Sequence, residues 1–225
     1  MSGRAGGGWR LVLFGAPGVG KGTQAQAIRT RLGLVHVATG DMLRAAMQAG
    51  TALGLQARAI VERGGLVPDA LVGAMMTERL AQPDVAGGFL LDGFPRTAVQ
   101  ADLLDGLLAG RGQRLDRVIN IAVPEPEILE RLTGRRMCSG CGASYHVRDL
   151  RPRVEGRCDV CGGSLQQRAD DTVEAIAHRL GVYQAETAPL VTRYERAGVL
   201  LTVDGRGRPE EVTRRILAGL PGWDA

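Results

Sequence analysis

The sequence predicts an α/β protein built on a doubly wound, parallel, five-stranded sheet that is flanked by helices. Two observations lead to this fold class. Short apolar segments alternate along the chain with longer segments of helical periodicity, and Leu115–Val123 carries apolar side chains on both faces, as strands buried in a parallel sheet do. The chain has 225 residues, 44% of them hydrophobic, which is enough for one sizeable core with small insertions.

The expected elements follow one another regularly. Strands are predicted at residues 9–14, within 33–41, within 87–96, at 115–123 and within 198–205. Helices are predicted from the glycine-rich stretch to about residue 32, at 42–50, 52–63 and 69–80, then to about 110, to about 133, at 171–197 and at 209–220. Pro124 and Glu125 suit the first turn of the helix ending near Thr133, while Asp171 and Glu174 have the spacing of a capping box.

Two segments interrupt this alternation. Residues 134–171 lack apolar periodicity and contain all four cysteines, which indicates an inserted unit, the cysteine module. Residues 38–67 separate two strands by more than a crossover needs, which indicates a second unit, the helical insertion. The core domain is then expected to comprise residues 9–37, 68–133 and 172–225, after a flexible glycine-rich tail at residues 1–8.

The stretch FGAPGVGKGTQ (Phe14–Gln24) follows the first predicted strand and holds the only lysine of the chain; arginine supplies the other 27 of 28 basic residues. It matches G-x-x-x-x-G-K-[ST], except that Gly22 is inserted before Thr23. Glycines let successive N–H groups converge on phosphate oxygens, and Lys21 adds a compact positive charge. The pattern favours a nucleoside triphosphate site, with a glycine-rich turn that binds no ligand as the alternative.

Other polar residues follow predicted strands. Asp92 ends a buried strand, where a carboxylate can hold magnesium-bound water near phosphates, although Asp92 and Gly93 can also form a simple turn. Thr39 and Arg44 lie at an ordinary helix start, so neither indicates a ligand by itself. These residues leave the phosphate acceptor open between water, a protein and another small molecule.

The cysteines form two C-x-x-C pairs, Cys138 with Cys141 and Cys158 with Cys161, sixteen residues apart. This spacing is typical of a structural zinc ribbon, in which four thiolates complete the tetrahedral shell and exclude water. Disulfides are the alternative, which a cytoplasmic setting disfavours, and the spacing leaves iron or cobalt open beside zinc. A module this small buries little apolar surface, so a metal can supply its folding free energy.

Other polar residues of the cysteine module are given no functional role. His146 is expected to be a packing or surface residue, because four cysteines already complete a metal site. Surface ion pairs are expected for Arg148, Arg151, Arg153 and Arg157.

Seven blocks together resemble the adenylate kinase family in order and spacing. They are GAPGVGKGTQAQ, TGDMLRAA, GLVPD, GFLLDGFPRT followed by Gln100, GRR at 134–136, RADD at 168–171 and the terminal VDG. The resemblance extends from about residue 9 to about residue 220. It implies reversible transfer of the terminal phosphoryl group of magnesium ATP to AMP, giving two ADP. It also implies that the helical insertion binds AMP and that the cysteine module is a zinc-bearing lid closing over ATP.

The resemblance implies roles for residues at matching positions. Expected at the ATP site are Gly18, Val19, Gly20, Lys21, Gly22, Thr23, Arg131, Ser144, Tyr145 and Gly207, with Arg208 as the alternative to Gly207. Expected at the AMP site are Thr39, Arg44, Gly65, Leu66, Val67, Gly93, Arg96, Gln100, Arg168 and Arg179. The catalytic set is Lys21, Arg96, Arg135, Arg168 and Arg179, which align and neutralise phosphates without a protein nucleophile. Gln100 offers a donor and an acceptor, as the edge of adenine requires.

Composition and charge help to exclude other classes of protein. The net charge of +4 favours anionic partners. No apolar run approaches the roughly 18 residues of a membrane span, and the N-terminus lacks a secretory signal pattern, so a cytoplasmic protein without membrane contact is expected. A nucleic-acid-handling ATPase is disfavoured, because only 4% of residues are aromatic and Tyr145 alone lies in the cysteine module. A non-catalytic nucleotide sensor and a kinase for another monophosphate remain alternatives, and the resemblance implies a monomer.

Overall fold

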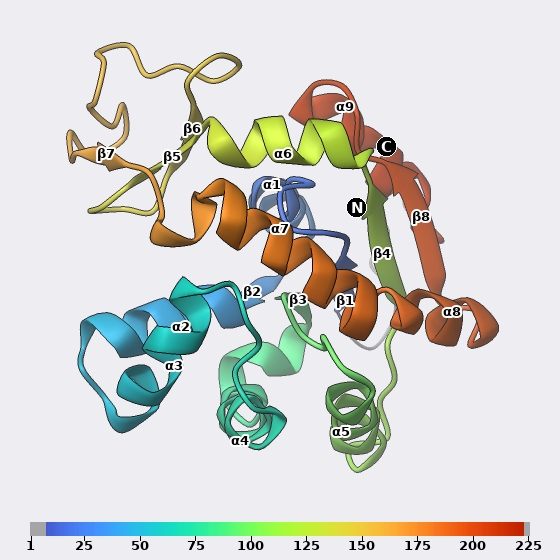
Figure 1. The fold of residues 1–225 in the computed structure, drawn as a ribbon. Coiled ribbons are helices and arrows are strands. Elements are labelled where there is room, and N and C mark those ends of the chain that lie inside the picture. The colour runs from blue at the N-terminus through green and yellow to red at the C-terminus, as the bar shows by residue number, and fades with distance from the viewer. Residues whose placement is uncertain (1–7, 223–225) are drawn as a thin grey trace.

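The computed structural model describes residues 8–222, and these form a parallel five-stranded sheet in the order β2-β3-β1-β4-β8 (Figure 1). The strands are β1 (Arg10–Phe14), β2 (Val35–Ala38), β3 (Phe89–Asp92), β4 (Arg117–Ala122) and β8 (Leu200–Asp204). Because all strands run the same way, their carboxyl ends share one edge, where Leu13 of β1 lies beside Asp92 of β3. The predicted fold class is confirmed.

Helices cover both faces of the sheet. They are α1 (Lys21–Leu32), α4 (Asp69–Leu80), η1 (Pro83–Gly87), α5 (Ala98–Ala109), α6 (Glu125–Thr133), α7 (Val173–Val182), α8 (Pro189–Arg196) and α9 (Pro209–Ala218). Leu11 and Leu13 of β1 pack in one apolar cluster with α1, α6 and α9, whereas Val12 and Phe14 pack in another with α4, α5 and α8. The alternation of side chains along a strand thus explains why the predicted strands are apolar on both faces.

The helical insertion contains α2 (Thr39–Gln48) and α3 (Ala52–Glu62). Thr51 caps α3 by accepting a hydrogen bond from the Gly54 N–H. A Cβ at Gly54 would lie 2.1 Å from the Ala46 carbonyl oxygen, so glycine permits the close approach of the two helices. Leu43 and Ala57 join the apolar cluster of α4 and α5, which makes this insertion continuous with the core.

The cysteine module has its own antiparallel sheet in the order β6-β5-β7. The strands are β5 (Arg135–Cys138), β6 (Ser144–His146) and β7 (Leu165–Gln166), and η2 (Ala169–Asp171) leads from them into α7. Cys138, Tyr145 and Cys158 form a small buried cluster separate from the two core clusters. Figure 1 shows this module and α2–α3 on the same side of the core, with the start of α7 between them.

The structure corrects the helix predicted at residues 171–197 in two respects. Its N-cap is Thr172, whose hydroxyl accepts from the Ala175 N–H, and Asp171 does not form the expected capping box because its carboxylate binds arginines. The helix is also interrupted by the π-helical segment η3 (Tyr183–Thr187). Pro189 has no N–H to continue the α-helical pattern, and the Ala188 N–H bonds instead to the Tyr183 carbonyl at 2.8 Å.

The expected N-terminal tail falls mostly outside the described residues, which begin at Gly8. Gly8 itself is packed against the backbone of η1, where a Cβ would lie 1.7 Å from the Gly87 carbonyl oxygen. Gly8, the last residue of the expected tail, thus lies in close backbone contact with the core domain. Between residues 8 and 222, no helix has the length and apolarity needed to cross a membrane.

Candidate active site

The glycine-rich loop joins β1 to α1 at the carboxyl edge of the sheet. Gly20 is the N-cap of α1 with φ of 97°, and Gly18 has φ of 86°; both are left-handed conformations that favour glycine. A Cβ at Gly18 would also lie 2.8 Å from Leu132, so glycine lets the loop pack on α6. No side chain caps α1, which leaves the N–H groups at its start available to an anion.

Lys21 is the first residue of α1, and its ammonium turns back over the loop. Nζ donates to the carbonyl oxygens of Gly15 at 2.7 Å and Ala16 at 2.9 Å. Burial, together with the charges of nearby arginines and against the opposing effect of Asp92, lowers the pKa of Lys21 to about 8. A buried cation among cations is a favourable position for a polyphosphate.

Asp92 lies at the end of β3, beside the point where the loop leaves β1. Nε2 of His36 on β2 is 3.7 Å from Asp92 Oδ2, too far for a hydrogen bond but close enough for an ion pair. Burial raises the pKa of Asp92, but His36 and the charges of Lys21 and Arg96 outweigh it, so the pKa lies below its ordinary value. Asp92 is therefore a carboxylate at neutral pH, as required of a group that holds cation-bound water.

Gly93 joins two predicted residues. Thr39 Oγ1 donates to the Gly93 carbonyl at 2.8 Å, and Arg96 Nε donates to the same oxygen at 2.9 Å. A Cβ at Gly93 would lie 2.7 Å from Thr39 Oγ1 and 2.9 Å from Arg96 Nη2, and its φ is 82°. Thr187 in the π-helical segment donates to the Arg96 carbonyl at 2.8 Å, so this irregular turn fixes the same loop.

Arg44, Arg96 and Arg168 approach one another from three separate segments. Arg44 on α2 pairs with Asp41 in its own helix. Burial lowers the pKa of both Arg44 and Arg96, and the charge of Arg168 lowers each of them further. Their mutual repulsion marks a region that favours an anion.

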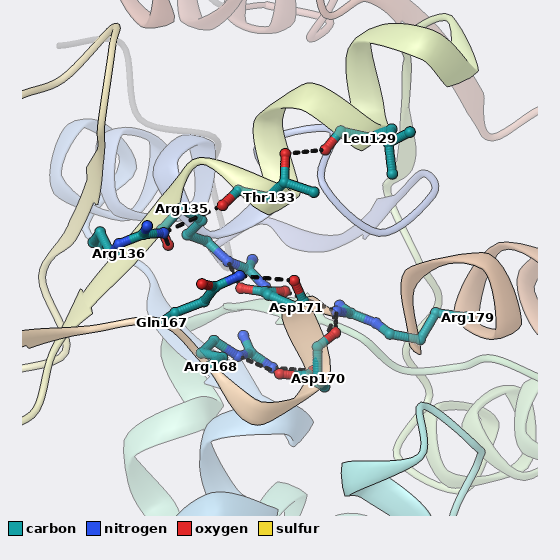
Figure 2. A network of polar contacts seen from close by, with 9 residues as sticks. All are labelled: Leu129, Thr133, Arg135, Arg136, Gln167, Arg168, Asp170, Asp171 and Arg179. Carbon is teal, nitrogen blue, oxygen red and sulfur yellow. Dashed lines mark hydrogen bonds and ion pairs between the residues drawn. The ribbon is translucent and has the colours of Figure 1, made fainter. Parts of the chain in front are cut away.

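Figure 2 shows the polar network between the cysteine module and α7. Arg135 binds Asp171 through Nε at 2.8 Å and Nη2 at 2.6 Å, and Arg168 binds Asp170 at 2.8 and 2.6 Å. Arg179 on α7 lies 3.1 Å from Asp171 Oδ1 and 3.2 Å from Asp170 Oδ2. The three predicted phosphate-binding arginines are thus brought together by two carboxylates.

The two carboxylates differ from surface partners in their burial. Asp171 is 0% exposed. Burial raises the pKa of Asp170, but Arg168 and Arg179 lower it by more, so its pKa lies below the ordinary value. The sequence prediction missed both residues as part of the site. The available signal was their position in the RADD block, shortly after Arg168.

Arg131 on α6 joins the glycine-rich loop to the β8–α9 connection. It donates to the Val19 carbonyl at 3.3 Å and to the Gly205 carbonyl at 3.0 Å, and it pairs with Glu127. Gly207 follows in that connection with φ of 98°, and Arg208 is the N-cap of α9. The predicted residue Arg131 therefore lies directly beside the loop that holds Lys21.

Gln100 on α5 is 2% exposed, and both ends of its amide have protein partners. Oε1 accepts from the Arg96 N–H at 2.8 Å, and Nε2 donates to Asp69 Oδ1 at 2.7 Å. Close by, a cavity of about 590 Å³ is lined by the predicted residues Leu66 and Val67, with Asp69, Thr97 and α7. Sequence reasoning missed Asp69, which lies 31 residues before Gln100.

Gly65 is the other predicted residue of this segment. A Cβ at Gly65 would lie 3.1 Å from the Ile60 side chain and 4.0 Å from His178 of α7. Its neighbour Gly64 has φ of 80°, and a Cβ there would lie 2.5 Å from the Arg179 side chain. These two glycines bring the end of α3 against α7.

The four cysteine sulfurs lie within 4.8 Å of one another. Cys138 Sγ is 3.4 Å from Cys161 Sγ, and Cys141 Sγ is 3.6 Å from Cys158 Sγ, whereas a disulfide bond is about 2.05 Å long. A tetrahedral metal with sulfurs at about 2.3 Å places them about 3.8 Å apart. All four are free cysteines, so the arrangement fits a metal and not disulfides.

Further contacts support the cysteine cluster. The Gly140 N–H donates to Cys138 Sγ and the Val160 N–H to Cys158 Sγ, each at 3.4 Å. The Tyr145 hydroxyl, 3.5 Å from Cys158 Sγ, lowers the pKa of that thiol to about 6 and so favours the thiolate that binds metal. The side chain of Tyr145 is thus directed into the module, while Ser144, its neighbour on β6, is exposed.

The expectation for His146 agrees with the contacts of the module, whereas that for the four arginines agrees only in part. His146 packs over Gly134, and its imidazole pairs with Asp149 and not with the cysteines. Of the four arginines expected in surface ion pairs, Arg148 is exposed and pairs with Glu130 and Asp149. Among the described residues, Arg151, Arg153 and Arg157 form no ion pair, so the expectation is wrong for these three.

Comparison with known proteins completes the description. The family model of adenylate kinase matches residues 13–199. The adenylate kinase of Carboxydothermus hydrogenoformans is 54% identical over 207 residues, which cover 92% of this chain and 97% of that protein. Those of Moorella thermoacetica and Geobacter sp. strain M21 are 56% and 50% identical, over 87% and 93% of this chain and 90% and 98% of the two proteins. The chain belongs to the adenylate kinase family.

Proposed function

We propose that the residues at the carboxyl edge of the sheet transfer the terminal phosphoryl group of magnesium ATP directly to AMP, giving two ADP. As a member of the adenylate kinase family, the chain is a nucleoside monophosphate kinase. The observation that carries the assignment of the site is the convergence of Lys21 with arginines from separate elements. Such a set stabilises charge spread over phosphate oxygens and needs no protein nucleophile.

On the ATP side, Gly18 to Thr23 would cradle the phosphates, and Lys21 would leave its two carbonyl partners to bridge toward the transferred group. Support comes from the uncapped start of α1 and from the contact of Arg131 with the Val19 carbonyl. Exposed Ser144, the main chain of Tyr145 and Gly207 or Arg208 would approach ATP when the cysteine module closes.

On the AMP side, Arg44, Arg96 and Arg168 would bind the phosphate and Thr39 with Gly93 would shape its entrance. The backbone at Gly65, Leu66 and Val67 and the amide of Gln100 would hold the base. The cavity beside Leu66 and Val67 supports this proposal, since it lies next to the Gln100 network.

Between the nucleotides, Arg135, Arg168 and Arg179 would transfer from carboxylates to phosphates. Asp170 and Asp171 keep these guanidinium groups together and paired. Phosphate oxygens can accept the same charge-assisted, bidentate hydrogen bonds from arginine as these carboxylates do. Arg135, on β5 of the cysteine module, would couple closure of that module to alignment of the phosphates.

Two metals fit the described residues. Asp92 would hold magnesium that arrives with ATP, through its bound water, and the ion would neutralise phosphate charge. The four cysteines would hold a structural zinc ion, which their sulfur separations fit. Zinc would fold the module and take no part in the transfer.

We further propose the division into a core domain (9–37, 68–133 and 172–225), an AMP-binding helical insertion (38–67) and a zinc-bearing lid (134–171). The protein is proposed to be a cytoplasmic monomer that binds neither nucleic acid nor membranes. Gel filtration with light scattering tests whether the protein is a monomer. Filter binding with single-stranded nucleic acid tests whether the protein binds nucleic acid.

The decisive experiment compares phosphoryl transfer from magnesium ATP to AMP, CMP, UMP and GMP, with metal content measured on the same sample. ADP formation greatest with AMP, and one zinc ion per chain, is expected. ATP binding without ADP formation would instead identify a nucleotide sensor.

A further inference from the structure

The amide of Gln100 is held in a closed ring of hydrogen bonds. Its Nε2 donates to Asp69 Oδ1 at 2.7 Å, and its Oε1 accepts from the Arg96 N–H at 2.8 Å. The second carboxylate oxygen, Asp69 Oδ2, accepts from Thr97 Oγ1 at 2.9 Å. Thr97 Oγ1 in turn accepts from the Gln100 N–H at 3.2 Å, which closes the ring.

This ring permits only one orientation of the amide. A carboxamide rotated by 180° has nearly the same shape, with its donor and acceptor exchanged. In the rotated state, Oε1 would face the Asp69 carboxylate and Nε2 would face the Arg96 N–H, so acceptor would meet acceptor and donor would meet donor. Each amide atom still keeps one free position, since Nε2 has a second hydrogen and Oε1 a second lone pair.

A fixed amide distinguishes purines that a rotating amide does not. Adenine presents an acceptor at N1 and a donor at its 6-amino group, whereas a 6-oxopurine presents a donor at N1 and an acceptor at O6. A carboxamide that rotates freely complements either edge. A carboxamide held in one orientation complements only one of them, and a mismatched polar pair is strongly disfavoured in a buried site.

We propose that Asp69 determines acceptor specificity, by fixing Gln100 so that 6-aminopurine monophosphates are accepted and 6-oxopurine monophosphates are rejected. This inference rests on the proposed binding of AMP beside Gln100. Asp69 acts through Gln100 and is a positioning residue. Its carboxylate does not cap α4, whose N-cap is Pro68, and Asp69 and Thr97 both line the cavity beside Leu66 and Val67.

The test is the selectivity of Asp69→Asn for AMP over inosine monophosphate (IMP). These acceptors differ in the edge at N1 and C6, and IMP lacks the 2-amino group of guanine. The asparagine amide can itself rotate to face either atom of Gln100, which removes the charged clash. We expect the ratio of kcat/KM for AMP to that for IMP to fall about tenfold, corresponding to about 1.4 kcal/mol. Asp69→Ser, which removes the carboxylate with a smaller side chain, should give a change in the same direction.

The matched control is Glu210→Gln. Glu210 is also an acidic residue in a first helical turn, but it lies on α9, on the opposite face of the sheet from α5. This variant loses the same favourable interaction with the helix dipole and should keep the wild-type AMP-to-IMP ratio. Melting temperatures of all variants separate a loss of stability from a loss of selectivity.

An unchanged ratio in folded Asp69→Asn and Asp69→Ser would overturn the proposal and leave Asp69 as a tie between α4 and α5. If neither variant folds, the proposal is tested by NMR, from the hydrogen-exchange rate of the Gln100 side-chain amide in the wild-type protein. A fixed amide gives slow hydrogen exchange, and exchange as fast as that of a surface glutamine would contradict it. A wild-type protein that fails to phosphorylate AMP would refute the proposed function instead.

Discussion

The helical insertion and the cysteine module are both small, but they are stabilised differently. Leu43 and Ala57 of the insertion are 8% and 0% exposed and belong to the same apolar cluster as α4 and α5. The cysteine module buries Cys138, Tyr145 and Cys158 in a cluster of its own. A small unit that shares the core of the domain needs no further stabilisation, whereas one that cannot share it needs a metal.

Despite this difference, the two units supply the same kind of side chain to the site. Arg44 comes from the helical insertion and Arg135 from the cysteine module. In the proposed site, both would bind phosphate near Lys21 of the core. The source of stability in each unit and the chemistry that the two units share can be tested separately.

Metal removal should have the largest effect of all, because it affects the stability of the cysteine module and not that of the helical insertion. A chelator is expected to unfold the cysteine module, because structural zinc binding contributes about 10 kcal/mol or more to the folding of such units. Melting should shift to lower temperature, by about 2–4 °C for each kcal/mol lost, with slower ADP formation following. Calorimetry and activity on one sample measure both. Unchanged melting together with abolished turnover would make the metal catalytic.

Lys21→Met should abolish most of the chemistry without affecting either unit. We expect kcat to fall by about 10³-fold, since one preorganised charge contributes on the order of 10²–10³. Stability should not fall, because burial of the ammonium is unfavourable, as its lowered pKa indicates. Steady-state kinetics and thermal melting provide the measurements. A parallel loss of activity and melting temperature would instead assign Lys21 a structural role.

Asp171→Asn tests the connection between the cysteine module and α7. Loss of its charge leaves Arg135 without its carboxylate partner and Arg179 with Asp170 alone, so we expect a loss of about 3 kcal/mol in unfolding free energy. The control is Asp149→Asn, which affects an exposed pair with Arg148 and should change stability by less than about 1 kcal/mol. Urea titration compares the two, and equal losses would refute the argument.

Leu43→Ala examines whether the helical insertion depends on the core. Loss of this buried side chain should lower the unfolding free energy by about 2–3 kcal/mol, because a cavity remains in the main cluster. Leu165→Ala in the cysteine module removes a half-buried leucine and should have a smaller effect. Metal content should stay constant in Leu43→Ala. A larger loss of unfolding free energy in Leu165→Ala than in Leu43→Ala would contradict the view that only the insertion depends on the core.

The pH dependence of ATP binding gives the smallest expected effect. The pKa of Lys21 lies at about 8 in the folded protein, below its ordinary value of 10.5, so the ammonium is lost above pH 8. ATP affinity should therefore weaken by up to about tenfold between pH 8 and 9, as measured by calorimetry. Folding stability should change in the opposite direction, rising between pH 8 and 10.5 as the buried charge disappears. Lys21→Met should lack this pH dependence.

Local patterns were sufficient for much of the fold and for two parts of the site. The glycine-rich stretch and the C-x-x-C pairs are short, and their geometry depends on residues adjacent in sequence. The five strands were likewise recognisable from apolar runs, with boundaries shifted by one or two residues. The predicted helix at 69–80 matches α4 as observed.

What the sequence did not reveal depends on contacts between distant segments. Asp171 has the spacing of a helix cap, but Arg135, 36 residues earlier, competes for its carboxylate and leaves Thr172 as the cap. The role of Asp69 depends on Gln100 and Thr97, on another helix. No local pattern encodes such pairs. The π-helical segment precedes Pro189, and its residue Thr187 donates to the distant Arg96 carbonyl.

Hydrogen exchange measured by mass spectrometry tests the central contrast most directly. The protein is compared with its metal and after chelation, and peptides from residues 38–67 and 134–171 are followed separately. Chelation should accelerate exchange strongly in 134–171 and leave 38–67 nearly unchanged. Equal acceleration in both segments, or none in 134–171, would contradict the view that one unit is folded by the core and the other by a metal.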